Sequence, residues 1–174
     1  MKIVLIGYMG SGKSTIGKQL AKLLNIQFKD LDQEIERVEN KNISEIFSKK
    51  GEIYFRKKEM EVLGSVLKEK SNIILATGGG TPCFGNTMEL LNSDKKITSI
   101  YLKSSIDILS KRLFIEKDER PLISHLHEYE DLKEFISKHL FERSYFYNMA
   151  CIKIDTDNLT PKEIAVSIKS KLLV

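Results

Sequence analysis

Residues 2–14 have the sequence KIVLIGYMGSGKS, in which an apolar run leads directly into a glycine-rich loop. The run is short, as expected of a strand buried in a parallel sheet. The loop, residues 7–14, matches the pattern G-x-x-x-x-G-K-[ST] of a phosphate-binding loop. Residues 15–24 follow it with apolar side chains at helical spacing. The order strand, loop, helix therefore predicts a nucleotide-phosphate site rather than a simple turn with a solvated lysine.

The chemistry of this loop points to ATP and Mg²⁺. Glycines let successive backbone N–H groups converge on an anion at the start of a helix. Lys13 supplies a positive charge for the β- and γ-phosphates, and the Ser14 hydroxyl is a hard oxygen ligand suited to Mg²⁺. The residues expected to bind the nucleotide are Gly10, Ser11, Gly12, Lys13, Ser14 and Thr15.

The composition fits one ordinary globular domain over residues 1–174, with 41% hydrophobic and 30% charged residues. The net charge of +4 is mild, so no nucleic-acid partner is needed to explain it. Two cysteines, Cys83 and Cys151, make neither a disulfide framework nor a metal cluster. No signal peptide precedes the first strand, and no apolar run approaches the ~20 residues of a membrane span. We therefore expect a cytoplasmic protein without a membrane partner.

Five short apolar segments alternate with helical patterns along the chain. We expect strands over residues 2–6, 26–32, 72–76, 97–102 and 151–155, and helices in each interval and after the last strand. Within the second interval, Ser44 is expected to cap a helix that Gly51 interrupts. This alternation predicts an α/β fold with one parallel sheet covered by helices on both faces, in three α/β/α layers.

Two carboxylates and three glycines follow the second and third strands. Asp30 and Asp32 are two residues apart, so both side chains would face one side of the strand end. Alternatively, Asp32 merely caps the next helix. Gly78, Gly79 and Gly80 offer backbone amides at the end of the third strand. Ligands in such sheets bind at the carboxyl ends of the strands, so these residues are candidates for holding a phosphoryl acceptor.

The remaining polar features are less specific. Arg56 and Glu59 share a helix face and could form a surface pair, although an isolated arginine on such a helix is usually solvated. Residues 116–123 are charged and interrupted by proline, as in a mobile segment. His125 and His127 are expected to be solvated rather than bound to a metal.

The chain lacks the marks of two large classes of nucleotide-binding protein. Asn40-Lys41-Asn42-Ile43 lacks the aspartate of the guanine-reading N-K-x-D motif, which argues against a GTPase. An ATPase motor usually has a strand ending in aspartate, whereas the third strand here ends in Ala76. The remaining set of residues suits a kinase with a small, hydroxylated, anionic acceptor.

The sequence resembles the shikimate kinases over nearly its whole length. The motifs that carry the resemblance are residues 7–15, Asp30-Leu31-Asp32, Phe55-Arg56-Lys57-Lys58-Glu59, Thr77-Gly78-Gly79-Gly80, Arg120-Pro121-Leu122, and Arg143 with Tyr147. The resemblance implies a sheet in the order 2-3-1-4-5, an acceptor-binding helical region at about 32–62 and a lid at about 114–127. It also implies transfer of phosphate from ATP to the 3-hydroxyl of shikimate, on the pathway to chorismate and aromatic amino acids.

The resemblance assigns roles on the phosphate side of the site. Lys13 would stabilise the phosphoryl oxygens, and Ser14 would ligate Mg²⁺, with Asp30 acting through water. Arg120 would swing from the lid onto the phosphates, as an arginine finger does. Arg112 would stack on adenine.

It also assigns roles on the acceptor side. Asp32 would orient the acceptor hydroxyl or take its proton, and Arg56 and Arg143 would clamp the carboxylate. Other residues would complete the pocket: Glu59 would hold Arg56, the glycines 78–80 would offer their amides, and Phe47 and Phe55 would form a wall.

The sequence departs from the family pattern near its end. The family usually has Arg-x-Pro-Leu-Tyr in the long helix, whereas residues 143–147 read RSYFY and Met149 replaces a glutamate. The alternatives left open are another small-molecule kinase, such as a gluconate kinase, and a nucleotide-binding module without kinase activity. We expect a monomer in either case.

Overall fold

The structure is a computed structural model that describes residues 1–117, 120 and 122–172. Its strands are β1 (Lys2–Ile6), β2 (Gln27–Asp30), β3 (Ile73–Ala76), β4 (Ile97–Lys103) and β5 (Ile152–Asp155). Its α-helices are α1 (Lys13–Leu24), α2 (Leu31–Glu39), α3 (Ile43–Lys68), α4 (Thr87–Ser93), α5 (Ile106–Glu116), α6 (Tyr129–Asn148) and α7 (Pro161–Leu172). A short 3₁₀ helix, η1 (Thr81–Cys83), follows the triple glycine.

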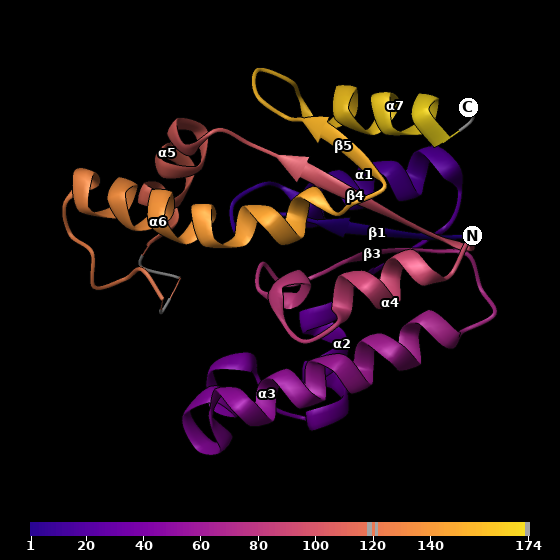
Figure 1. Ribbon diagram of the computed structural model, residues 1–174, viewed down its shortest axis with the longest axis horizontal. Coiled ribbons are helices and arrows are strands. Elements are labelled where there is room, and N and C mark those ends of the chain that lie inside the picture. Colours follow the sequence, from indigo (N-terminus) through magenta and orange to yellow (C-terminus); the bar gives the residue numbers. More distant parts are fainter. Residues whose placement is uncertain (118–119, 121, 173–174) are drawn as a thin grey trace.

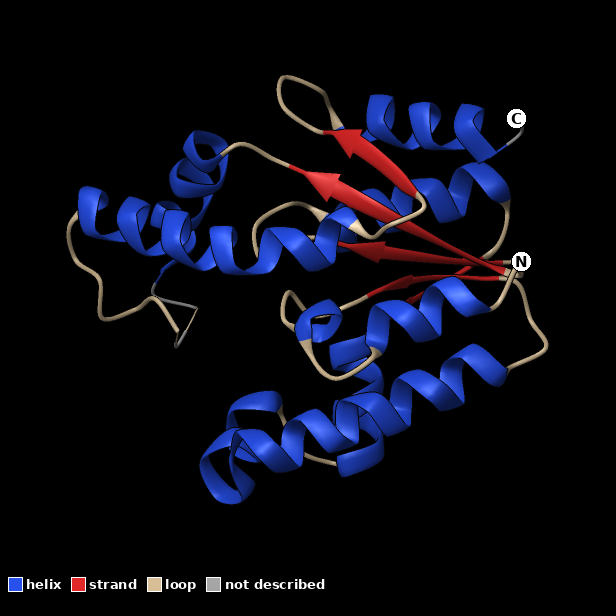
Figure 2. Cartoon of the chain, viewed as in Figure 1, coloured by secondary structure: helices blue, strands red, loops and turns tan. Residues whose placement is uncertain are grey.

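The five strands form one parallel sheet in the order β2-β3-β1-β4-β5. The fold class and the strand order predicted from the sequence are therefore confirmed. All the strands point the same way, and the N-terminus and the end of α7 lie at the end of the sheet opposite the carboxyl ends of the strands (Figure 1). Helices flank both faces of the sheet, as Figure 2 shows.

The central strand explains why the first apolar run shows no polar alternation. Ile3 and Leu5 point into a hydrophobic cluster with α1 and α7, and both are fully buried. Val4 and Ile6 point to the other face, into a cluster with α4, α5 and α6. A strand covered on both sides needs apolar side chains at every position. The phosphate-binding loop (P-loop, residues 7–14) therefore follows a strand whose residues are all buried.

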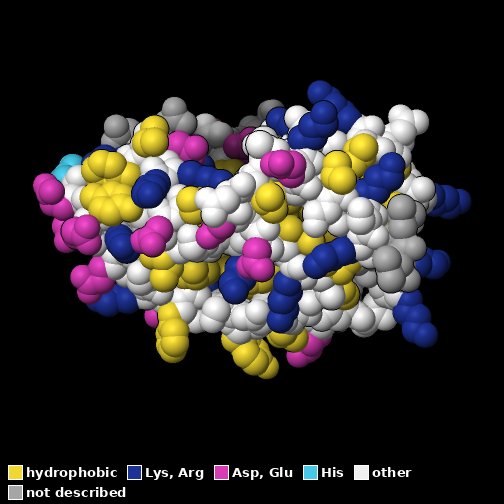
Figure 3. All heavy atoms as spheres, turned by 90° about the horizontal axis from the view of Figure 1, so that it is seen from above, with side chains coloured by type: hydrophobic (Ala, Val, Ile, Leu, Met, Phe, Trp, Pro, Cys, Tyr) yellow, Lys and Arg dark blue, Asp and Glu magenta, His cyan; other side chains and the backbone are white. Residues whose placement is uncertain are grey.

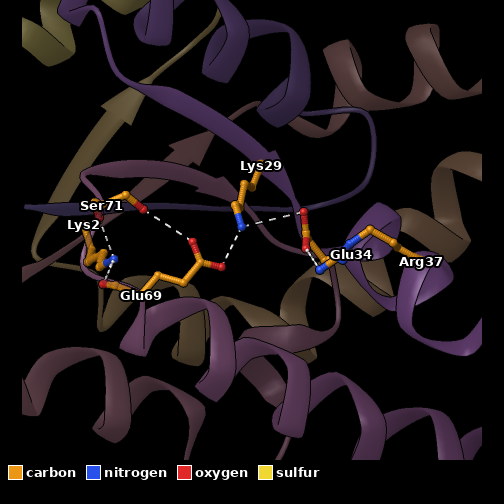
Figure 4. A network of polar contacts seen from close by, with 6 residues as sticks. All are labelled: Lys2, Lys29, Glu34, Arg37, Glu69 and Ser71. Carbon is orange, nitrogen blue, oxygen red and sulfur yellow. Dashed lines mark hydrogen bonds and ion pairs between the residues drawn. The ribbon is translucent and has the colours of Figure 1, made fainter.

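A polar network ties the far end of α3 to the sheet (Figure 4). The Lys2 ammonium donates to the backbone carbonyls of Glu69 and Ser71, at 2.6 and 2.7 Å. The Glu69 carboxylate pairs with Lys29 on β2 at 2.6 Å, and Lys29 also lies 3.9 Å from Glu34 on α2. Lys29 is nearly buried, so these contacts are less screened than ordinary surface pairs. The network fixes α2 and α3 against β1 and β2.

The second strand is shorter than predicted, and this changes the argument for Asp32. β2 ends at Asp30, and Asp32 lies in the first turn of α2. The Asp30 carboxylate accepts a hydrogen bond from the Asp32 backbone N–H at 3.1 Å and caps the helix. The prediction that both carboxylates lie on one strand face was therefore wrong. The alternative was also wrong, because Asp30 and not Asp32 is the cap.

The start of α3 also differs from the prediction. Asn42, not Ser44, is the N-cap: its side chain accepts from the Glu45 N–H at 2.8 Å. The Glu45 carboxylate accepts in return from the Asn42 N–H at 3.3 Å, which completes a capping box. The predicted break at Gly51 is confirmed, since its φ of 78° is left-handed and interrupts the helix.

The surface carries charges of both signs. Basic and acidic side chains are both spread over the face seen in Figure 3, with hydrophobic side chains between them. None of the helices in the described part of the chain combines the length and the apolar character that crossing a membrane requires.

Candidate active site

A pocket of about 490 Å³ opens beside the carboxyl ends of β1, β2 and β3. This is where ligands bind in open parallel sheets. The predicted site residues that line it are Gly10, Ser11, Gly12, Lys13, Ser14, Thr15, Asp30, Asp32, Gly78, Gly79, Arg112 and Arg120. The other predicted residues, Phe47, Phe55, Arg56, Glu59, Gly80 and Arg143, do not line this pocket.

The P-loop forms the floor of the pocket. Gly12 has a φ of 88°, which suits glycine, and it stands at the N-cap of α1 without a side-chain cap. The Lys13 ammonium donates to the carbonyls of Gly7 and Tyr8, at 2.8 and 2.9 Å. Within the described residues, the buried Ser11 hydroxyl has no hydrogen-bond partner. A concave loop with spare donors at a helix N-terminus is suited to bind phosphate.

The Lys13 ammonium is set in a strongly charged environment. Burial lowers the pKa of Lys13 to about 8, while the nearby carboxylates of Asp32 and Asp30 act to raise it. Arg120 and Arg143 act to lower it further, so both guanidinium groups lie within electrostatic range of the P-loop. An anion bound here would meet several positive charges at once.

Ser14 and Asp30 lie together at the edge of the P-loop. The Ser14 hydroxyl donates to Asp30 Oδ2 at 2.7 Å. Hydroxyl and carboxylate oxygens are the hard ligands that Mg²⁺ prefers, so the pair fits the metal. In the described part of the chain no group of three or more His, Cys, Asp or Glu residues could hold a metal by itself. The donor set is therefore of the kind in which substrate phosphates and water complete the coordination of Mg²⁺.

Asp32 lies between the phosphate loop and the triple glycine. Burial raises its pKa to about 6, the negative charges of Asp30 and Glu59 add to the rise, and the Lys13 charge opposes it. A Cβ placed on Gly78 would lie 3.4 Å from Asp32 Oδ1 and 3.1 Å from Glu59 Oε1. The structure thus brings Asp32 next to both Lys13 and the Glu59 carboxylate.

Arg56 and Glu59 form a buried ion pair rather than a surface pair. Arg56 Nη1 donates to Glu59 Oε2 at 2.8 Å, and the Glu59 side chain is fully buried. The Arg56 guanidinium also lies 5.2 Å from the centroid of the Phe55 ring, on which the Phe47 ring packs at 4.5 Å. A Cβ on Gly80 would lie 2.5 Å from Arg56 Nη2. The guanidinium is therefore held against the triple glycine of residues 78–80, called the glycine loop below.

Arg143 reaches the site from α6. Its guanidinium carbon lies 5.9 Å from the centroid of the Tyr8 ring in the P-loop. Tyr147, one turn later, donates its hydroxyl to the Gly79 carbonyl at 2.6 Å and stacks on Tyr101. Burial raises the pKa of Tyr147, and a hydrogen bond with Arg143 acts in the opposite direction. Despite the altered sequence after Arg143, the helix places both side chains at the loops of the site.

Two further arginines stand on and after α5. Arg112 Nη1 donates to the Gly10 carbonyl at 3.1 Å, which places it at the outer end of the P-loop. Arg120 pairs with Glu116, and both side chains are exposed by a third or more. In the predicted Arg-Pro-Leu motif, Pro121 lies outside the described residues, as do residues 118 and 119 of the predicted lid. His125 and His127 are exposed, as predicted.

The structure adds residues that the sequence analysis missed. Leu159, Pro161 and Ile164 line the pocket from the loop after β5 and the start of α7. The position of this loop at a strand's carboxyl end was a usable signal. His139 on α6 contacts the P-loop through Tyr8, whose hydroxyl lies 2.9 Å from His139 Nδ1. No local pattern marks that long-range contact.

Comparison with known proteins gives a consistent result. The sequence model of the family described as shikimate kinase matches residues 9–173. A shikimate kinase of Flavobacterium johnsoniae is 52% identical over 167 residues, which cover 96% of each chain. Another from Flavobacterium psychrophilum is 46% identical over the same length.

Solved structures agree with this result. The crystal structure of shikimate kinase from Bacteroides thetaiotaomicron superposes with a TM-score of 0.90 at 34% identity, and covers 100% of this chain and 99% of its own. Shikimate kinase from Acinetobacter baumannii in complex with shikimate gives a TM-score of 0.86 at 34% identity, over 99% and 92% of the two chains. A gluconokinase from Sinorhizobium meliloti has a TM-score of 0.62 at 16% identity, a likeness of fold alone.

Proposed function

This chain belongs to the shikimate kinase family, and from that premise we propose how its pocket transfers the γ-phosphoryl group of ATP to the 3-hydroxyl of shikimate. The products are shikimate 3-phosphate and ADP. The P-loop holds the triphosphate, and the acceptor lies beyond it, between Asp32, Arg56 and the triple glycine.

One observation carries the proposal. Asp32 lines the same pocket as Lys13 and lies beside Gly78 and Glu59, next to the buried Arg56–Glu59 pair. A protein that only held a nucleotide would have no use for a half-buried carboxylate next to the phosphate loop. An acceptor bound there would present a hydroxyl to Asp32 and a carboxylate to Arg56.

The proposed reaction is an in-line displacement. The 3-hydroxyl oxygen of shikimate forms a bond with the γ-phosphorus while the bond from that phosphorus to the β–γ bridging oxygen breaks. Asp32 orients the hydroxyl and takes its proton, and ADP leaves with the bridging oxygen. Lys13 stabilises the negative charge on the transferring oxygens, which is the main task in phosphoryl transfer.

Two guanidinium groups are proposed to hold the shikimate carboxylate. Arg56 is oriented by Glu59, and Arg143 approaches from α6 beside Tyr8. Guanidinium groups bind carboxylates in a bidentate manner, which fixes orientation as well as affinity. The amides of Gly78, Gly79 and Gly80 remain predicted donors to the acceptor. The Arg56 guanidinium packs on the Phe55 ring, and the Phe47 ring packs against Phe55.

Mg²⁺ is proposed to bind at Ser14, with Asp30 acting through a water molecule. When bound, the ion neutralises charge on the β- and γ-phosphates. The Ser14 hydroxyl now donates to Asp30, so its oxygen is already placed at the edge of the P-loop. Asp30 also caps α2 and thereby places Asp32.

At the other end of the pocket we propose the adenine site. Arg112 would stack on the base, and Leu159, Pro161 and Ile164 offer it an apolar wall. Flat aromatic bases are well held between a guanidinium plane and apolar side chains.

Arg120 is proposed to join the phosphates when the lid closes. Its present partner, Glu116, is an exposed i,i+4 neighbour, and such pairs contribute only about 0.2–1 kcal/mol. A triphosphate would easily draw Arg120 away. The proposed lid is the segment of about 114–127, and the proposed acceptor-binding region is the segment of about 32–62. Both belong to one domain over residues 1–174.

We also propose that the protein acts as a monomer in the cytoplasm, where ATP is available, with shikimate as its small-molecule partner. One copy supplies the P-loop, Asp32 and the four arginines proposed for the site, Arg56, Arg112, Arg120 and Arg143. No second chain is therefore needed to complete the proposed site. The mild net charge of +4, with charges of both signs on the face seen in Figure 3, gives no reason to propose nucleic acid or a membrane as a partner.

A coupled assay of ADP release tests the proposal. Shikimate should support turnover that requires Mg²⁺, and gluconate should not. Turnover of gluconate but not shikimate would favour the related sugar-acid kinase. ATP binding with no acceptor-dependent turnover would leave only a nucleotide-binding module.

A further inference from the structure

A third residue stands behind the Arg56–Glu59 pair. Thr81 begins η1, directly after the triple glycine, and its side chain is fully buried. Its hydroxyl donates to Glu59 Oε1 at 2.6 Å. The other oxygen of the same carboxylate, Oε2, accepts from Arg56 Nη1 at 2.8 Å. The three side chains therefore form one chain of hydrogen bonds, from the glycine loop through α3 to the guanidinium.

The geometry of this chain limits the orientation of Glu59. A buried carboxylate with one bonded oxygen can rotate, whereas one with both oxygens bonded on opposite sides is fixed. Thr81 is itself fixed by the backbone, because its N–H donates to the Gly78 carbonyl at 3.3 Å and its carbonyl accepts from the Phe84 N–H at 3.4 Å. The hydroxyl thus transmits the position of the glycine loop to the carboxylate.

The guanidinium is set by two features of that same loop. Nη1 is bound by Glu59, and Nη2 lies where a Cβ on Gly80 would come within 2.5 Å. The third nitrogen, Nε, lies 3.6 Å from the exposed carboxylate of Glu52, a longer contact than that between Nη1 and Glu59. The orientation of Arg56 therefore depends on Glu59, and the orientation of Glu59 depends on Thr81.

We propose that Thr81 is a positioning residue for the acceptor carboxylate, acting through Glu59 on Arg56. The inference rests on the proposed role of Arg56 in binding shikimate. Thr81 itself touches neither the acceptor nor ATP. Its hydroxyl keeps the guanidinium in the plane that meets the incoming carboxylate.

A purely structural role for the hydroxyl makes a different prediction. If Thr81 only satisfied a buried carboxylate, its loss would lower the thermal stability and leave the kinetic constants of the folded enzyme unchanged. A positioning role raises the KM for shikimate and leaves the KM for ATP unchanged. The measurement that distinguishes the two roles is therefore whether the KM for shikimate rises while the KM for ATP stays the same.

The decisive variant is Thr81→Val, which keeps the shape of the side chain and removes the hydroxyl. We expect the KM for shikimate to rise ~10-fold, as for loss of one hydrogen bond to a charged group, with the KM for ATP within ~2-fold. Thr81→Ser, which restores the hydroxyl, should return the KM for shikimate to within ~3-fold of the parent value. If Thr81→Val does not fold, Thr81→Ala tests the loss of the hydroxyl with a smaller side chain.

Thr87→Val is the matched control. Thr87 is as deeply buried, and its hydroxyl donates to the Phe84 carbonyl at 2.7 Å, but it does not contact Glu59. Its loss should change the stability and leave the KM for shikimate unchanged. An equal rise in KM for both valine variants would overturn the proposal.

A double-mutant cycle with Glu59→Ala, which removes the partner of the Thr81 hydroxyl, tests the route of the effect. If Thr81 acts through Glu59, adding Thr81→Val to Glu59→Ala should change the KM for shikimate by less than ~2-fold. Additive effects would show that Thr81 acts by another route and would contradict the proposal.

Arg56→Ala separates this inference from the proposed function. If Arg56→Ala leaves the KM for shikimate unchanged, the acceptor site has been misplaced and both ideas fail. If Arg56→Ala raises it and Thr81→Val does not, only the role of Thr81 is wrong.

Discussion

The two sides of the pocket are built in different ways. The phosphate side is built mainly from consecutive residues, 10–15, which follow β1 and include the first residues of α1, and its donors include backbone groups. The acceptor side comes from α2, α3, the glycine loop and α6, and apart from the predicted amides of that loop its groups are side chains. Its geometry depends on contacts between residues far apart in sequence, such as Thr81 with Glu59 and Tyr147 with Gly79. A backbone site should tolerate changes around it better than a site made of linked side chains.

The largest effect is expected at Lys13, the P-loop side chain proposed to stabilise the transferring phosphoryl group. Lys13→Met should lower kcat by ~10³-fold or more, because a positive charge that stabilises the transition state is lost from a water-poor site. The backbone of the P-loop remains, so some ATP binding should persist in calorimetry. Lys22→Met, an exposed lysine in the last turn of the same helix, is the control and should leave kcat unchanged. Normal turnover of Lys13→Met would remove Lys13 from the proposed mechanism.

Asp32 lies between the phosphate side and the acceptor side of the pocket. Its replacement should give the second largest fall in kcat. Asp32→Asn keeps the size of the side chain and removes its ability to take a proton, so kcat should fall by ~10²-fold or more. Both substrates should still bind. Glu34→Gln removes the other acidic side chain from the first turn of α2 and should turn over normally. The roles are separated by steady-state kinetics with each substrate varied, and near-normal kcat in Asp32→Asn would exclude it as the base.

Removing a side chain that serves only the acceptor side should weaken the binding of shikimate and leave the binding of ATP unchanged. Arg56→Ala removes the guanidinium and leaves the Glu59 carboxylate buried and unpaired, so the KM for shikimate should rise by roughly 30-fold or more. ATP affinity should persist in calorimetry. The control is Arg37→Ala, which breaks an exposed pair with Glu34 on α2. A loss of ATP binding in Arg56→Ala would show that Arg56 serves the phosphate side.

The same contrast explains what the sequence could predict. The P-loop and the strand order were accessible, because a local motif and a family resemblance specify them. The resemblance also named Ser14 and Asp30 for one metal site, and the structure joins these two residues by a hydrogen bond. Asp32 was predicted to lie near Asp30, and it does, but the reason given was wrong. β2 ends at Asp30, and the two carboxylates are brought together because Asp30 caps the helix that contains Asp32. The contacts of Thr81 with Glu59 and of Tyr8 with His139 escaped notice. These contacts arise only when distant elements pack, and no short-range periodicity encodes them.

The glycine loop offers a smaller and purely steric test of the acceptor side. Gly80 has a φ of −88°, which any residue can adopt, so Gly80→Ala should not strain the backbone. Its new Cβ would, however, lie 2.5 Å from Arg56 Nη2 and displace the guanidinium. We expect the KM for shikimate to rise ~10-fold, since a shift of about 1 Å at a binding group has effects of up to ~10²-fold. An unchanged KM would mean that Arg56 can bind the acceptor from more than one position.

Gly64 on α3 is the matched control for Gly80, and Gly64→Ala should have the smallest effect of the substitutions considered. A Cβ at Gly64 would meet nothing within 4 Å, and the residue lies in the second, regular part of the helix. Gly64→Ala should therefore stabilise the folded protein by about 0.5–1 kcal/mol, because alanine loses less backbone entropy in a helix. The midpoint of thermal unfolding should rise by about 1–4 °C, and both Michaelis constants should stay unchanged. If Gly64→Ala raised the KM for shikimate as Gly80→Ala should, the effect would come from α3 as a whole, and the close contact between Gly80 and Arg56 would not be its cause.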